Sequence, residues 1–163
     1  MLFRSLMSDD LYERDVLAWS EREADFLRRL SRGERVNDVD WAHLVAEIED
    51  VGLSELNAVV SHLEQMLVFL LKLRAWPENP SVRHWRVEVV AFQRNAARRF
   101  APSMRQRIDL GRLYRDAADQ LEAGQERGDP PLGLPADCPF TLDEFLTDRW
   151  ERLEAVARAA GLG

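Results

Sequence analysis

The 163-residue chain has a single cysteine, Cys138, and no long hydrophobic run. One cysteine can form neither an internal disulfide nor a cysteine metal cluster, so nothing requires an oxidising compartment. The opening residues lack the apolar core of a signal peptide, and the longest apolar run, Met66 to Leu71, is far shorter than a membrane span. These absences predict a soluble, cytoplasmic protein that does not enter a membrane.

Motifs that mark the common catalytic classes are also missing. The chain has no glycine-rich loop for phosphate, and Ser61 lacks the flanking glycines of a hydrolase nucleophile elbow. It contains no Glu-x-x-His motif, which helix-bundle di-iron proteins use to supply metal ligands. No reaction can therefore be assigned from a motif.

The chain does have strong helical patterning. Apolar residues recur at three- and four-residue steps, the period of an amphipathic helix, at Leu44, Ile48, Val51, Val59, Leu63, Met66, Leu70 and Leu73. Glycine is scarce, and a length of 163 residues is usual for one domain with a real core. We therefore predict an all-α fold without a sheet, a single helical bundle of five or six helices that spans residues 1–163.

Capping residues and prolines indicate where these helices begin and end. Helices are expected over about residues 11–30, from Asn37 or Asp38 to Trp76, from Ser81 to Phe100, from Pro102 to about Arg127, after Thr141, and over about residues 150–160. The segment 128–140 is dense in proline and glycine and is expected to be a loop.

The residue that decides the length of the second helix is Gly52. An unbroken helix from Asp38 to Trp76 would be about 58 Å long at 1.5 Å per residue, more than a compact domain of this size comfortably contains. This length favours a break at Gly52, with Ser54 as the next cap. Because the apolar phase continues across the glycine, one kinked helix is the alternative.

Charge alternates along the chain. Residues 1–71 carry a formal charge of -8, residues 72–107 carry +7 and residues 108–163 carry -6, which sums to the net charge of -7. A basic helix that pairs with acidic neighbours would explain this alternation, each exposed pair contributing about 0 to 1 kcal/mol. Alternatively, Arg83, Arg94 and Arg98 share one helix face and form a surface for nucleic acid or an acidic partner. The net negative charge and the lack of a nucleic-acid motif disfavour nucleic acid.

A second group of polar residues has metal-ligand chemistry. Its members are Asp15 and Glu23 on the first expected helix, Asp40, His43 and Glu47 on the second, and His62 further along. If the chain turns back at Gly52, His62 comes opposite His43 and Glu47, so carboxylates and imidazoles would converge between helices around a transition metal. The structural alternative is that Asp40 favours a helix start, and that Asp15 or Glu47 accepts a hydrogen bond from a tryptophan indole or pairs with an arginine.

Several local patterns point to one family. They are Tyr12, Asp15 and Trp19; Asp40 with Leu44; Glu47-Ile48-Glu49 with Gly52; Leu70-Leu71-Lys72; Trp85-Arg86; Pro102-Ser103; and Cys138-Pro139-Phe140-Thr141-Leu142. On these residues the chain resembles, over about residues 11–148, the bacterial helical family called domain of unknown function number twenty-nine. The resemblance implies an all-helical bundle and supplies no activity, substrate or cofactor; residues 149–163 would be a helical extension. The chain departs from the family pattern at Phe69, where members often have histidine, and at Ala46, where an acid is common.

These observations favour a binding or interaction protein without catalysis. Its expected partner is another protein or a second copy of the chain, and no cofactor is expected. A metal-dependent enzyme built on Asp15, Asp40, His43, Glu47 and His62 is the alternative. Nucleic-acid binding through Arg83, Arg94 and Arg98 is a further alternative.

Overall fold

The computed structural model describes residues 11–127, 129 and 132–159, and in this part of the chain every regular element is a helix. The elements are α2 (Val16–Ser31), α3 (Trp41–Ala75), α4 (Val82–Arg99), the 3-10 helix η1 (Pro102–Arg107), α5 (Leu110–Ala123), α6 (Leu142–Thr147) and α7 (Trp150–Ala159). The predicted all-α class is confirmed. The predicted number of helices is not matched, because a helical segment over residues 11–14 and two six-residue helices accompany five longer ones among the described residues.

Contacts divide the chain into two compact units rather than one bundle. Unit 1 ends at Leu53 and unit 2 begins at Ser54, so the boundary lies inside α3. Unit 1 contains α2 and the beginning of α3, and unit 2 contains the rest of α3 with the later helices.

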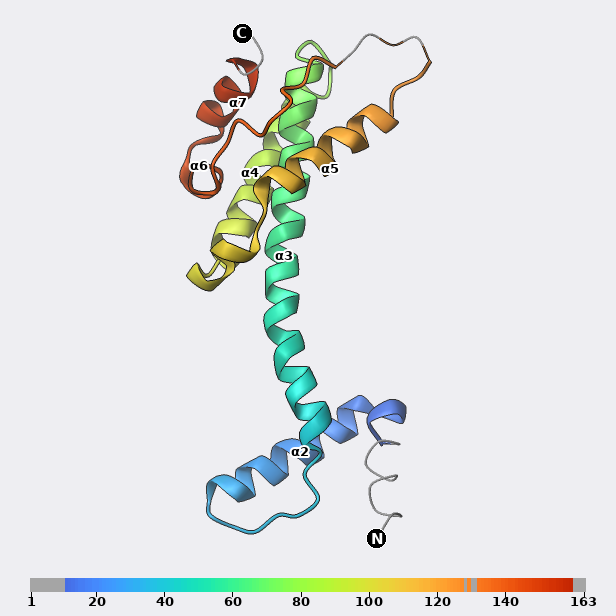
Figure 1. Ribbon diagram of the computed structural model, residues 1–163, viewed down its shortest axis with the longest axis vertical. Coiled ribbons are helices and arrows are strands. Elements are labelled where there is room, and N and C mark those ends of the chain that lie inside the picture. Colours follow the sequence, from blue (N-terminus) through green and yellow to red (C-terminus); the bar gives the residue numbers. More distant parts are fainter. Residues whose placement is uncertain (1–10, 128, 130–131, 160–163) are drawn as a thin grey trace. The chain divides into compact units, whose positions relative to one another are not determined.

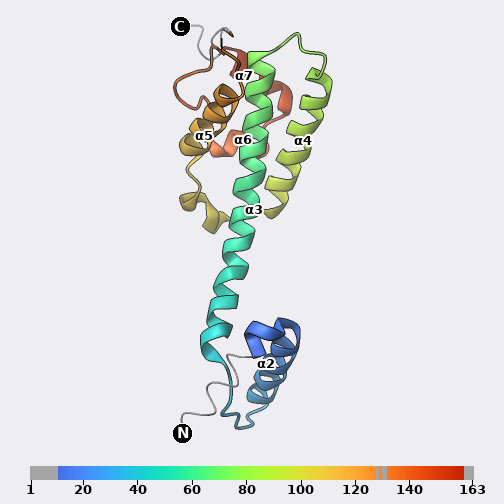
Figure 2. The same ribbon diagram turned by 90° about the vertical axis from the view of Figure 1, so that its right-hand side faces the viewer.

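The long helix α3 corrects the expected break at Gly52. Residues 41–75 form one continuous helix of 35 residues (Figure 2). Gly52 does not adopt a positive φ, and a Cβ placed on it would meet no atom within 4 Å. The size of one compact domain does not limit the length of α3, because α3 contributes to two units.

Gly52→Ala is expected to raise the free energy of unfolding by about 0.5 to 1 kcal/mol, because alanine costs less backbone entropy than glycine inside a helix. Urea denaturation followed by circular dichroism measures the change. The matched control is Gly33→Ala, whose φ of 81° disfavours any side chain and should make that variant less stable. Destabilisation by Gly52→Ala would contradict a continuous helix at this position.

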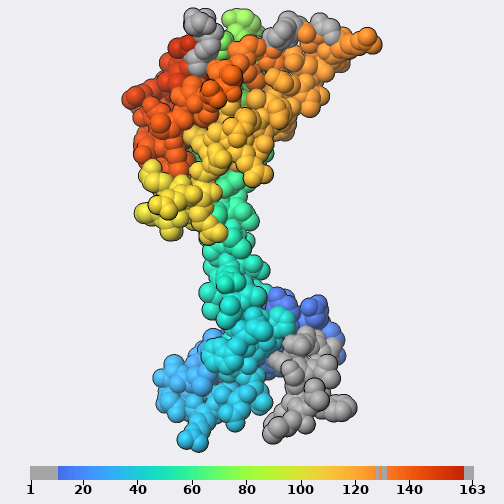
Figure 3. Space-filling view, viewed as in Figure 1, coloured from blue at the N-terminus to red at the C-terminus, as the bar shows by residue number. Residues whose placement is uncertain are grey.

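The hydrophobic core belongs to unit 2. All but one of the described buried hydrophobic residues come after Ser54, and α3 supplies the largest share, with Leu63, Met66, Leu67 and Leu70 fully buried. In both ribbon views α4 runs alongside this part of α3 (Figures 1 and 2). Figure 3 shows α5, α6 and α7 covering much of α3 in unit 2.

The apolar character of α3 follows from this burial. By length and composition alone α3 could cross a membrane, and it is the one such helix in the described part of the chain. Half of its most apolar stretch is buried inside the protein, as in the core helix of a helical bundle.

Unit 1 is built differently. The expected helix over residues 11–30 is interrupted at Asp15, which has non-helical backbone angles (φ -152°, ψ 83°) and whose carboxylate accepts a hydrogen bond from the Ala18 amide at 2.9 Å. Asp15 therefore caps α2, as acidic residues do at helix starts. Among the described residues of unit 1, Trp19 is the one buried hydrophobic side chain, and the other buried residues are Glu23 and Asp40.

The C-terminal helices begin where their sequence predicts. Thr141 and Glu144 form the expected capping box at the start of α6, with the Thr141 amide donating to the Glu144 carboxylate at 2.8 Å. The final helix begins at Trp150 as expected. The last residues of the predicted 149–163 extension lie outside the described part of the chain.

Candidate functional site: an arginine-flanked apolar groove

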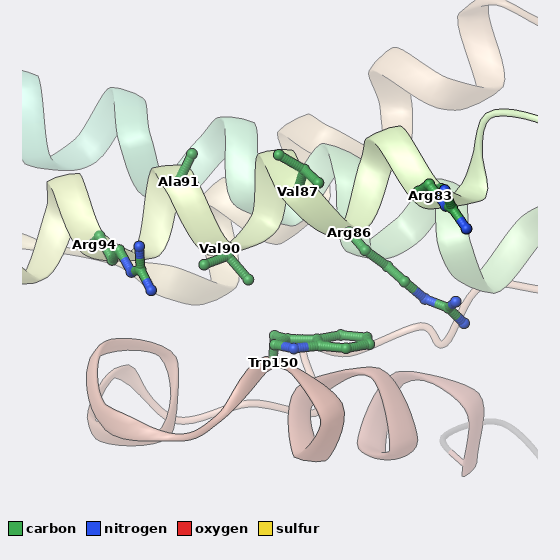
Figure 4. A pocket seen from close by; sticks show the side chains of 7 residues that line it. All are labelled: Arg83, Arg86, Val87, Val90, Ala91, Arg94 and Trp150. Atoms are coloured by element: carbon green, nitrogen blue, oxygen red, sulfur yellow. The ribbon is translucent and has the colours of Figure 1, made fainter.

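A groove of about 420 Å³ lies in unit 2 between α4 and the start of α7 (Figure 4). We call it the arginine groove, and it is lined by Arg83, Arg86, Val87, Val90, Ala91 and Arg94 of α4 and by Trp150 of α7. Its size lies in the range of natural ligand sites. Most of the surface in its middle is aliphatic and aromatic, with guanidinium groups at the edges.

The sequence of α4 produces this arrangement because its two faces differ. Trp85, Val89 and Ala96 are buried on the core side. Arg83 and Arg94 lie on the other side of α4. They are eleven residues apart, or about three full turns of an α-helix, so both lie on one face. Figure 4 shows Val87, Val90 and Ala91 between these two arginines, with the Trp150 ring facing them.

The wall opposite α4 is held by α6 and α7. The Gln93 side-chain amide donates to the carbonyl oxygens of Phe145 at 3.0 Å and Asp148 at 2.6 Å, at the end of α6. Phe145 and Leu153 are fully buried and fix α6 and α7 to the core. These anchors leave Trp150 half-buried at the groove rather than inside the core.

One of the three groove arginines is part of the wall. The Arg86 guanidinium donates to the two carboxylate oxygens of Glu154 at 3.3 and 3.0 Å. It also lies over the Trp150 ring, 5.4 Å from the ring centroid. The Glu154 side chain is only 8% exposed and has a second partner in Arg158, so its charge is compensated within the fold. Arg86 therefore contacts both Glu154 and the Trp150 ring on α7.

Five other arginines of the basic segment fall into two groups. Arg99 donates to Glu55, and Arg105 donates to Asp143, as the charge alternation predicts for a basic helix between acidic neighbours. By contrast, Arg83, Arg94 and Arg98 make no hydrogen bond or ion pair in the described part of the chain. Arg83 and Arg94 line the groove, whereas Arg98 is exposed on the next turn and does not line it.

The five predicted metal ligands are not brought together. Asp15 caps α2. His62 lies on α3 fifteen residues after Glu47, about 22 Å along a continuous helix, and its ring packs near Phe92 at a centroid distance of 5.9 Å. The turn at Gly52 that would have brought His62 back toward Glu47 does not form. Within residues 11–127, 129 and 132–159, no three His, Cys, Asp or Glu side chains are placed to hold a metal ion.

Asp40, His43 and Glu47 do meet, but in a hydrogen-bonded network of unit 1. The Asp40 carboxylate accepts from the Trp19 indole at 3.1 Å and lies 2.7 Å from His43 Nδ1. The Asp40 amide donates to the buried Glu23 carboxylate at 3.0 Å. Glu47 accepts from the hydroxyl of Tyr12, whose ring stacks on His43 with centroids 3.9 Å apart.

This network explains the acidic residues as structural. Burial alone would raise the pKa of the Asp40 carboxyl, but the hydrogen bonds from His43 and Trp19 together outweigh it, so the pKa lies below the usual value. The sequence correctly indicated that an acid would hold an indole, but the acid is Asp40 rather than Asp15 or Glu47. Each carboxylate already has donors, which leaves a network suited to fixing helices rather than to binding metal.

Sequence reasoning identified Arg83 and Arg94 and missed the apolar middle of the groove. Val87, Val90 and Ala91 occupy the arginine side of α4, away from the stripe that faces the core. Their position between two arginines was visible from helical spacing. Trp150 also lines the groove, whereas Phe145 and Leu153 of the neighbouring helices are buried in the core.

Comparisons with known proteins give a family without an activity. The family described as "Domain of unknown function DUF29" matches residues 11–151, which confirms the resemblance seen in the sequence. Among solved structures, an alpha-helical protein of unknown function from Rhodospirillum rubrum is similar, with 31% identity and a TM-score of 0.63; the match covers 88% of this chain and 95% of that one. No curated protein matches the chain.

Proposed function

The chain belongs to the DUF29 family, and from the arginine groove we propose that it is a binding protein whose partner presents an acidic amphipathic helix. The observation that carries the proposal is the pair Arg83 and Arg94, which lack partners in the described part of the chain and stand at the two ends of one apolar groove.

The middle of the groove is suited to apolar side chains. Val87 is 60% exposed on the side of α4 that faces away from the core, and it lines the groove with Val90 and Trp150. An exposed apolar surface with a polar rim is typical of a protein interaction site. Tryptophan and arginine are also the residues that contribute most often to the binding energy of interfaces.

The two arginines determine which charge the partner helix must carry and how far apart its charged residues must be. Eleven residues of α-helix separate Arg83 from Arg94, or about 16 Å along the axis. A partner helix that lies along α4 can present apolar residues at i, i+3, i+4 and i+7 to the groove, as in other helix-in-groove complexes. Acidic residues about eleven positions apart would then meet the two guanidinium groups.

The same geometry favours a protein over nucleic acid. Sequence-tolerant binding of single strands needs open aromatic faces for base stacking, and the Arg86 guanidinium lies over the ring of Trp150. Two unpaired arginines in a groove with an aliphatic floor would also neutralise few phosphates, while the whole chain carries a net charge of -7.

The test is selection from a displayed library of helical peptides of about 18 residues, long enough to span the groove. We expect peptides that bind the wild-type protein to carry acids about eleven positions apart around an apolar stripe. Arg83→Glu with Arg94→Glu should weaken a selected peptide about tenfold or more at physiological salt, because two attractive contacts become repulsive. Fluorescence anisotropy measures the affinities.

The control is Arg98→Glu, which makes the same substitution once on the same helix outside the groove, to be compared with each of Arg83→Glu and Arg94→Glu alone. It should change the peptide affinity by less than about threefold, since only long-range screened charge is altered. Selected peptides without acidic bias, or peptides that bind the double variant as well as wild type, would contradict the proposal. Stronger binding of a single-stranded oligonucleotide, lost in the double variant, would replace it with the nucleic-acid alternative.

A further inference from the structure

Residues 28–35, at the end of α2 and in the loop after it, form a basic turn in an acidic unit. The turn contains four arginines and one acid, Glu34, which gives a formal charge of +3. The other residues between 1 and 53 contain three arginines and twelve acids, which gives -9. We call residues 28–35 the arginine turn, and its local charge predicts contact with an anion.

Two of the four arginines already hold an anion. Arg29 Nε and Arg32 Nε each donate to a different carboxylate oxygen of Glu34 at 3.0 Å. These hydrogen bonds hold the pKa of Glu34 below its usual value. Arg28 and Arg35 are exposed and make no hydrogen bond or ion pair in the described part of the chain. The arginine turn therefore has two cations left for a second anion.

Ser31 lies among these arginines as the last residue of α2. Its exposed hydroxyl donates to the Arg28 carbonyl oxygen at 2.8 Å, within its own helical turn. Gly33 follows with a φ of 81°, and residues 34–39 have no regular structure. The buried residues of α2, Trp19 and Glu23, belong to earlier turns. The last turn of a helix frays at little cost, so Ser31 can enter an enzyme site while the rest of α2 stays folded.

We propose that Ser31 is a phosphorylation site for a serine kinase whose substrate groove is lined by acidic side chains. Arg28 and Arg29 precede the serine by three and two residues, and kinases select their substrates by charge patterns of this kind. The kinase transfers the γ-phosphoryl group of a nucleoside triphosphate. A bond forms between Ser31 Oγ and the γ-phosphorus, the bond to the bridging oxygen breaks, the hydroxyl proton passes to the kinase base, and a nucleoside diphosphate leaves.

The arginine turn also retains the phosphate that is added. Arg28 lies three residues before Ser31 on the same side of α2, where its guanidinium can donate to the phosphate oxygens. This contact offsets the unfavourable position of a negative charge at the end of a helix. A phosphoserine carries about -1.5 to -2 charges near neutral pH, so the formal charge of the turn falls from +3 to about +1.

The first test is phosphorylation of the folded full chain with Mg²⁺ and ATP by an arginine-directed serine kinase, beside an acid-directed serine kinase. Intact mass and peptide mapping count and locate the phosphates. We expect one phosphate at Ser31 from the arginine-directed kinase alone. Arg28→Gln and Arg29→Gln should each lower kcat/KM at Ser31 about tenfold. Arg98→Gln is the control, since it removes an exposed arginine without a described partner from unit 2 and should leave the rate unchanged.

A synthetic peptide of residues 24–36 measures the rate at an unhindered serine. The full chain should be phosphorylated within about tenfold of the peptide, because only the end of α2 has to open. A full chain that reacts more than about a hundredfold more slowly than the peptide would overturn the proposal, since the fold would then hide Ser31. Phosphate placed on other serines instead, or equal rates for wild type and Arg28→Gln, would also overturn it.

The second test is a ³¹P NMR titration of full chain in which phosphoserine is incorporated at position 31 during translation. The phosphate should titrate at a lower pH in the wild-type background than in Arg28→Gln, with midpoints about 0.3 or more apart, because a guanidinium stabilises the dianion. Identical midpoints would contradict retention by Arg28. Ser31 does not line the arginine groove, so phosphorylation should leave the affinity for an acidic helical peptide unchanged, and this inference and the proposed function can fail separately.

Discussion

Phe145→Ala is expected to lower the free energy of unfolding of unit 2 by about 3 to 5 kcal/mol, the usual cost of truncating a buried phenylalanine. Phe145 is completely buried, packs against Phe140 with ring centroids 5.0 Å apart, and fixes α6 to the core. Its loss should also loosen the wall that carries Trp150, so binding of an acidic helical peptide should fall with stability. Urea denaturation and peptide anisotropy measure the two effects.

The control for this prediction is Leu146→Ala on the same short helix. Leu146 is only partly buried, so its truncation should cost less than that of Phe145 and should leave the peptide affinity nearly unchanged. A cost below about 1 kcal/mol for Phe145→Ala would mean that α6 does not depend on this side chain.

Asp40→Ala is expected to open unit 1 while unit 2 stays folded. The Asp40 carboxylate accepts a hydrogen bond from the buried Trp19 indole and contacts His43. Each buried donor left without a partner costs about 1 to 3 kcal/mol of stability. Loss of both interactions should destabilise unit 1 by about 2 to 4 kcal/mol. Hydrogen exchange should then accelerate over residues 16–53 and remain slow over the buried part of α3 after Val59.

Asp38→Ala is the matched control, because Asp38 is exposed two residues earlier and should tolerate truncation. Acid provides an independent check with a defined sign. The pKa of Asp40 is lower in the folded protein than in the unfolded chain, so its contribution to stability is complete above the unfolded pKa and is lost as the pH falls through the lowered folded value. Wild-type unit 1 should therefore lose protection on acidification toward and below about pH 4. If exchange in unit 1 is equally slow in Asp40→Ala, the network does not support the unit.

The sequence predicted those parts of the fold that depend on local signals. Apolar periodicity indicated α3, and capping residues indicated where α4 and α6 begin. The continuity of α3 was not predictable in the same way, since glycine is compatible with both a break and a helix interior. The outcome depended on how contacts divide between two units, which the local pattern at Gly52 does not contain.

The candidate site was predictable to a similar degree. Charge counting identified Arg83 and Arg94, but it could not separate them from Arg99, which has a partner in Glu55, 44 residues away. The sequence also grouped Asp40, His43 and Glu47 correctly while assigning them metal-ligand chemistry. Their actual donors, Trp19 and Tyr12, come from a different part of the chain, and spacing along one helix does not reveal such partners.

The hydrogen bonds of Gln93 have a consequence for how this region can change in evolution. Its side-chain amide holds the end of α6 through two main-chain carbonyl oxygens rather than through side chains. Every amino acid has a main-chain carbonyl, so these two hydrogen bonds do not depend on which side chains occupy positions 145 and 148. Phe145 is nevertheless constrained by its own burial. We therefore expect related chains to keep an amide side chain at position 93, whereas position 148 is constrained only through its side chain, by the ion pair between Asp148 and Arg152 at 3.1 Å.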